Sequence, residues 1–131
     1  MENLNYRSSR PIALNGVHDL TICAYSIKGG PFSCIDLVDC HNIHITQCEL
    51  TNSDQPGVNL TNCANILIDN CLVVNVLIGI HSLNGSNIQV RNNKIKQLRR
   101  DGALVSFENI NADAEEVSSY AMNNYLELEK Q

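Results

Sequence analysis

A repeat of about 23 residues constrains this chain more than any other feature of its sequence. Four segments with one shared pattern start 23, 23 and 22 residues apart, at Asp19, Asn42, Asn65 and Asn87. A second set of short apolar segments keeps the same period and begins at Ile12, Ile35, Val58, Ile80 and Ala103. Because a fixed period of this length is typical of solenoids, each repeat is predicted to form one coil of a stack.

Inside each repeat, apolar residues alternate with polar ones, which is the period of a β-strand. The alternating pairs are Leu20 and Ile22, Ile43 and Ile45, Ile66 and Ile68, and Ile88 and Val90. A third strand position carries Ile27, Leu50, Val73 and Ile95. We therefore predict an all-β fold, a right-handed parallel β-helix of about four coils stacked at the ~4.8 Å strand spacing. The 18 asparagines and the 5% aromatic content suit this fold, because narrow repeated layers need little aromatic bulk.

Two other solenoids compete with this prediction. A left-handed β-helix would show six-residue sub-repeats, which the sequence lacks. A leucine-rich repeat accommodates the spacing of Cys63, Ile66, Ile68, Cys71 and Val73. However, the other half of each repeat is again strand-like, where a horseshoe needs helical spacing, and isoleucine outnumbers leucine at these positions. Both observations favour the parallel β-helix.

Two long runs carry a family resemblance. C-I-D-L-V-D-C-H-N-I-H-I-T-Q-C-E-L starts at Cys34, and G-V-N-L-T-N-C-A-N-I-L-I-D-N-C starts at Gly57. The pattern resembles the pectate-lyase-like superfamily over roughly residues 11–110. That superfamily includes pectate lyases, polygalacturonase-like hydrolases, alginate epimerases and phage tailspikes. The resemblance implies a fold and leaves the function open, because many functions share this coil pattern.

The 131 residues are enough for one domain. We predict an N-terminal extension over residues 1–10, the β-helix over 11–110 and a C-terminal helix within 111–131. Asp113 and Glu116 have the spacing of a capping box. Apolar residues then follow at helical spacing, which predicts an amphipathic helix over 113–129 that covers the open end of the stack. These residues are Val117, Tyr120, Ala121, Asn124 and Leu128.

Charge and hydropathy narrow the choice of partners. The net charge of −5 argues against nucleic acid, because phosphate binding requires a basic excess. No apolar run reaches the ~18 residues of a membrane span, so no membrane association is expected. The amino terminus lacks the apolar core of a secretory signal, which favours a cytoplasmic location. No sequence motif indicates a cofactor.

Cysteines and histidines occupy equivalent positions in successive repeats. Cys40 stacks with Cys63 and Cys48 with Cys71, but no Cys-x-x-Cys motif is present, so we predict buried, reduced thiols. His18 and His41 are likewise equivalent, with His44 nearby. These three imidazoles are weak candidates for a metal site. A histidine stack on the surface, without a metal, is the favoured interpretation.

The resemblance also suggests where an active site would lie, on the outward face of the sheet whose strands follow the glycines. The outward column there is predicted to be Ala13, Asp36, Asn59, His81 and Leu104. The two-acid segments of polygalacturonase-like families correspond to 54–56 and 76–78 here, and the second is wholly apolar. Weak catalytic candidates remain in Asp36 and His81, roughly 10 Å apart across two coils, and in Arg100 and Asp101.

Five of the nine basic residues lie within 91–100. This cluster suggests an anion site, and with the sheet column it makes Asn59, Arg91, Lys94 and Arg99 the ligand-binding candidates. Pairing of the cluster with the acidic C-terminal helix is the favoured alternative.

We expect a short binding or structural module with a polysaccharide or protein partner. The alternative is a polysaccharide lyase or epimerase, or a fragment of one. A stack of about four coils is only ~20 Å tall, which favours the module. The end near Pro11, Ile12, Leu14 and Val17 has no coil to cover it, so we also predict a homodimer.

Overall fold

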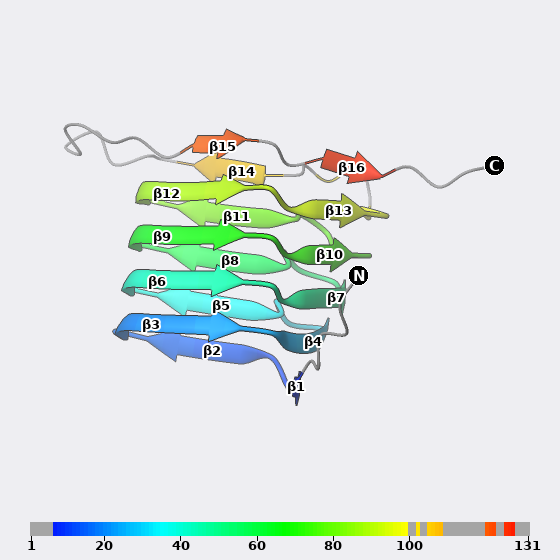
Figure 1. Ribbon diagram of the computed structural model, residues 1–131, viewed down its shortest axis with the longest axis horizontal. Helices are drawn as coiled ribbons and strands as arrows, with labels where there is room; N and C mark the ends of the chain where they lie inside the picture. Colours follow the sequence, from blue (N-terminus) through cyan, green and yellow to red (C-terminus); the bar gives the residue numbers. More distant parts are fainter. Residues whose placement is uncertain (1–6, 100–101, 103–104, 109–119, 123–124, 128–131) are drawn as a thin grey trace.

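The computed structural model describes residues 7–99, 102, 105–108, 120–122 and 125–127, and every regular element within them is a β-strand. The strands form three parallel sheets, here called A, B and C (Figure 1). The chain runs from sheet B to sheet C to sheet A and returns to sheet B one level higher. This path confirms the predicted right-handed parallel β-solenoid of about four turns.

Each sheet is a ladder of strands taken from successive coils. Sheet A contains β1 (Arg7–Ser9), β4 (Tyr25–Gly30), β7 (Glu49–Ser53), β10 (Leu72–Val74), β13 (Lys94–Lys96) and β16 (Tyr125–Glu127). Sheet B contains β2 (Ile12–Asn15), β5 (Ile35–Val38), β8 (Val58–Thr61), β11 (Ile80–Leu83) and β14 (Val105–Glu108). Sheet C contains β3 (His18–Cys23), β6 (His41–Thr46), β9 (Ala64–Asp69), β12 (Ser86–Arg91) and β15 (Tyr120–Met122).

The core consists of columns of aliphatic side chains that pair in register from coil to coil. Ile43, Ile66 and Ile88 form one column, and Ile45, Ile68 and Val90 form the next. All six side chains are at most 2% exposed, as the alternation predicted. Burying each contributes about 1.5–3 kcal/mol to stability. The segments 51–60 and 74–83 carry strands where a horseshoe would need helices, which excludes the leucine-rich repeat.

Asparagine is abundant because the coil turns through left-handed residues. Nine asparagines have φ between 53° and 61°, a region that asparagine tolerates better than most residues. Their side chains also form ladders between coils: Asn75 Nδ2 donates to Asn52 Oδ1 at 2.8 Å, and Asn87 Nδ2 donates to Asn65 Oδ1 at 2.8 Å. The corners are thus stabilised by both the backbone preference and the amide ladders.

The cysteines are free, and five of the six are buried, which confirms the prediction for the stacked pairs. Cys63 Sγ donates to Leu37 O at 3.4 Å, and Cys71 Sγ contacts Ile45 O at 3.9 Å, each a carbonyl in the coil below. Small side chains with a weak donor therefore suit these corners. Burial raises the pKa of Cys34 to about 11, while Cys23 is exposed.

The predicted C-terminal helix is wrong where the structure describes that segment. Residues 120–122 and 125–127 form β15 and β16, which pair with β12 and β13. Ala121 pairs with Val90 and Leu126 with Ile95, so the segment extends two existing ladders. Long-range pairing with open strand edges has overridden a helical spacing that local sequence favoured. The remainder of the predicted helix lies outside the described residues.

The ends of the stack also differ from the predicted boundaries. β1 pairs with β4, so part of the N-terminal extension belongs to sheet A, and β15 and β16 extend the stack beyond residue 110. In the described part of the chain, no helix is long and apolar enough to cross a membrane.

Candidate functional site

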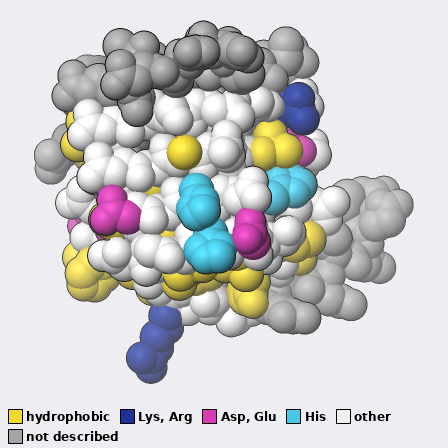
Figure 2. Space-filling model, turned by 90° about the vertical axis from the view of Figure 1, so that its left-hand side faces the viewer, with side chains coloured by type: hydrophobic (Ala, Val, Ile, Leu, Met, Phe, Trp, Pro, Cys, Tyr) yellow, Lys and Arg dark blue, Asp and Glu magenta, His cyan; other side chains and the backbone are white. Residues whose placement is uncertain are grey.

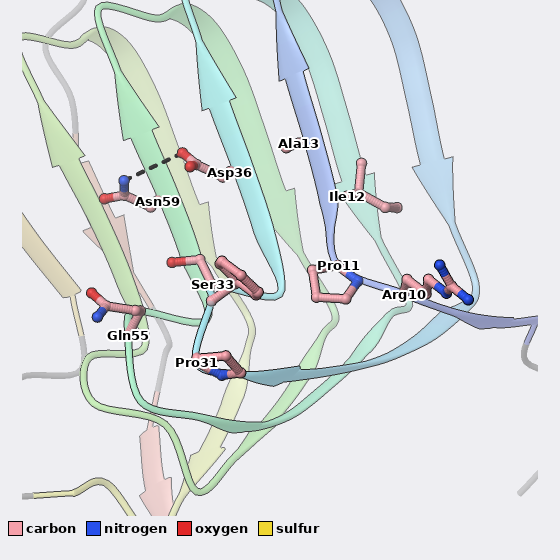
Figure 3. A pocket seen from close by; sticks show the side chains of 10 residues that line it. Arg10, Pro11, Ile12, Ala13, Pro31, Ser33, Asp36, Gln55 and Asn59 are labelled. Atoms are coloured by element: carbon pink, nitrogen blue, oxygen red, sulfur yellow. Dashed lines mark hydrogen bonds between the residues drawn. The ribbon is translucent and has the colours of Figure 1, made fainter.

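A cleft of about 550 Å³ opens on the outer face of sheet B, where β2, β5 and β8 begin (Figure 3). Asp36 and Asn59 project from neighbouring strands onto its floor. The loops that enter β5 and β8 supply Phe32 and Gln55, and Arg10 comes from the segment before β2. The cleft is thus formed by the first residues of three strands of sheet B and by the two loops that enter β5 and β8.

A row of hydrogen-bonded polar side chains runs up sheet B from this floor. Asn59 Nδ2 donates to Asp36 Oδ1 at 3.3 Å, and His81 Nδ1 lies 2.9 Å from Asn59 Oδ1. His81 Nε2 lies 3.2 Å from Glu108 Oε2. The two catalytic candidates, Asp36 and His81, are therefore linked by hydrogen bonds through Asn59 and do not contact each other directly.

This row sets the orientation of each member. A carboxylate only accepts, so Asn59 presents its NH₂ group to Asp36 and its oxygen to His81. His81 Nδ1 must then carry a proton, and the Glu108 carboxylate faces the other ring nitrogen.

The register corrects one member of the predicted column. His81 pairs with Ser106, so Ser106 and not Leu104 continues the outward column of sheet B. The repeat steps 25 residues here, from Ile80 to Val105, instead of the 23 between Ile12 and Ile35. The longer step places β14 two residues later than the alignment at Ala103 had indicated.

Buried contacts hold the two entry loops in place. The Ser53 hydroxyl, which is fully buried, lies 2.7 Å from Phe32 O and 2.9 Å from Gln55 O, and it accepts from the Gln55 amide at 3.0 Å. Gly29 must be glycine, because a Cβ there would overlap Phe32 O and Ser53. One hydroxyl therefore links both loops that line the cleft.

The basic residues predicted to bind an anion do not converge. Arg91 projects from sheet C, in register with Asp69, whereas Lys94 begins β13 in sheet A. Arg99 forms an ion pair with Asp54 and donates from Nε to Asn75 Oδ1 at 2.9 Å. The ion-pair partner of Arg99 is thus Asp54, an acidic residue in a loop two coils below. Arg100 and Asp101 lie outside the described residues.

Histidine side chains gather at the corner between sheets B and C, with acidic side chains on both sides (Figure 2). The rings of His18 and His41 stack with their centroids 4.9 Å apart. The hydrogen bond from His18, together with one from Asn42, lowers the pKa of Asp19. His44 turns away and contacts Asp69 Oδ1 at 2.9 Å.

Among the residues that the structure describes, no group of three or more His, Cys, Asp or Glu side chains is placed to hold a metal ion. The contacts of His18 and His44 with aspartates account for their positions.

A shallower hollow of about 440 Å³ lies on the outer face of sheet C. Asp19 and Asn42 form one wall, and Thr21, His44 and Leu67 continue across it. Asn42 Nδ2 donates to Asp19 Oδ1 at 2.6 Å, so this wall is part of the corner ladder.

Sequence reasoning anticipated Asp36, Asn59 and His81 but missed Phe32, Gln55, Arg10 and Glu108. Phe32 is 64% exposed and is one of two exposed large hydrophobic residues in the described part of the chain. The missed signal was an aromatic residue between Pro31 and Ser33, outside the alternating pattern that marks the core.

Comparison with known proteins agrees with this architecture. A profile described as "Right handed beta helix region" matches residues 11–126. No curated protein and no solved structure matches the chain.

Proposed function

The chain belongs to the right-handed β-helix family, and from that premise we propose that it is a carbohydrate-binding module that uses the cleft on sheet B. Phe32 carries this proposal. An aromatic ring that is 64% exposed beside hydrogen-bonding groups offers an apolar surface to one face of a sugar ring.

The polar groups of the cleft complement that surface. Asp36 and Asn59 stand side by side on the floor, and Gln55 adds an amide from the loop that enters β8. Carboxylates and amides present acceptors and donors to hydroxyl groups, which both donate and accept. A few placed polar groups beside an apolar wall are typical of small-molecule sites.

The enzymatic alternative has less support. A glycosidase uses two carboxyl groups that face one cleft. Asp36 is the one carboxylate among the described residues that line this cleft, and Asn59 separates it from His81. We therefore favour binding without turnover.

A glycan array followed by NMR titration of the folded chain tests the proposal. We expect saturable binding that Phe32→Ala weakens about tenfold, which corresponds to about 1.4 kcal/mol. Leu20→Ala is the matched control, since it removes the other exposed large hydrophobic residue, which lies on sheet C outside the cleft. Binding that both variants weaken equally, or binding of no glycan at all, would refute the proposal.

A further inference from the structure

We infer that the cleft selects a neutral glycan over an acidic one such as a polyuronate. This inference rests on the proposed function and adds the chemical class of the ligand. It follows from the charges of the cleft floor and from the positions of the basic residues.

The centre of the cleft floor is acidic. Asp36 lies there half-buried, and the one hydrogen bond that its Oδ1 receives from the described residues comes from a neutral amide, that of Asn59, at 3.3 Å. A sugar carboxylate placed over this pair would lie close to a like charge with no cation between them. Like charges at short range disfavour binding, and more strongly where water is partly excluded.

Among the described residues, the bases of the 91–100 cluster lie away from this floor. Arg91 and Lys94 project from sheets C and A, and Arg99 is paired with Asp54. Within the described lining, Arg10 is the one cation, and it lies at the opposite end of the cleft from Gln55 and Asn59 (Figure 3). The described residues of the floor therefore offer no positive partner to an acidic sugar.

Neutral hydroxyl groups match the same floor. One hydroxyl can donate to Asp36 while its neighbour accepts the second amide proton of Asn59, because the two side chains are already in contact. Hydrogen bonds to an ionised carboxylate are stronger than those between neutral groups, so Asp36 favours a ligand rich in hydroxyls.

Calorimetry with oligosaccharides of equal length tests this selection. Neutral probes are cellohexaose, xylohexaose and maltohexaose, and acidic probes are hexagalacturonate and hexamannuronate, all at pH 7.5 and low salt. We expect at least one neutral probe to bind at least tenfold more tightly than either uronate. Asp36→Asn should weaken the neutral probe about tenfold and reduce its advantage over the uronates.

Asp39→Asn is the matched control. It also removes one carboxylate, but at the exposed left-handed corner that follows β5, where Asn62 and Asn84 occupy the equivalent positions. Asp39→Asn should leave the preference for neutral over acidic probes unchanged. If both variants reduce this preference equally, it depends on the net charge of the protein and not on Asp36, and the inference is overturned.

Two further results would overturn the inference in different ways. In the first, the uronates bind as tightly as the neutral probes and lose that binding in Arg10→Gln. This result would show that Arg10 recognises an acidic ligand. That outcome would refute the selection of neutral glycans but would leave the proposed carbohydrate-binding function standing. If neither the probes nor the glycan array shows binding, both the inference and the proposed function are refuted.

Discussion

Replacing Asn93 should destabilise the coil stack more than replacing any exposed asparagine. The Asn93 side chain is fully buried, in the column position that Cys71 holds one coil below. Its Nδ2 donates to Ile68 O at 3.1 Å, and its Oδ1 accepts from the Cys71 amide at 2.9 Å. Asn93→Ala leaves a buried donor and a buried acceptor without these partners.

The expected loss follows from those two groups. Each buried polar group left unsatisfied costs about 1–3 kcal/mol, so Asn93→Ala should lower the free energy of unfolding by about 2–6 kcal/mol. Asn93→Cys should lose about half as much. Its thiol can donate to Ile68 O as Cys71 donates to Ile45 O, but it cannot accept from the Cys71 amide.

Urea unfolding followed by circular dichroism measures this loss, and hydrogen exchange at the Cys71 amide reports the local contact. The control is Asn92→Gly, because Asn92 is exposed at φ 59° and glycine adopts that conformation freely. It should stay within about 0.5 kcal/mol of the parent chain. If Asn93→Ala changes the free energy of unfolding no more than this control, and the exchange rate of the Cys71 amide is unchanged, the buried Asn93 amide does not stabilise this corner of the coil.

Three further predictions concern ionisation, thiol access and association. Because the raised pKa of Cys34 keeps its thiol protonated until about pH 11, stability should be complete below pH 9 and fall by about 2–3 kcal/mol as the pH rises to 11. Cys34→Ala should flatten that part of the profile, and an unchanged profile would contradict the assignment. A thiol reagent at pH 8 should label Cys23 quickly and the five buried cysteines slowly, so rapid native labelling of more than two thiols, counted by mass spectrometry, would contradict the burial. We also predict that Leu20, which is 38% exposed although its column neighbours are buried, packs against a second copy, and sedimentation at micromolar concentration as a 14.5 kDa monomer would refute this.

The repeat by itself determined the fold and most of the core. Alternation at Ile43, Ile45, Ile66 and Ile68 specifies which side chains point inward, and a constant period brings equivalent residues into register. The stacking of the cysteines follows from the same constant period. These features are predictable because each depends on a local pattern repeated at a fixed step.

Only the tertiary structure determined the features that do not follow the regular repeat. Residues 120–122 and 125–127 are strands because the open edges of β12 and β13 offer backbone partners that helical spacing cannot reveal. The 25-residue step into β14 depends on pairing with β11, which made Ser106 the neighbour of His81. The cleft also depends on distant contacts, because the buried Ser53 hydroxyl joins the loops of Phe32 and Gln55 from two successive coils. Such contacts form only after the coils have stacked, so no single segment encodes them.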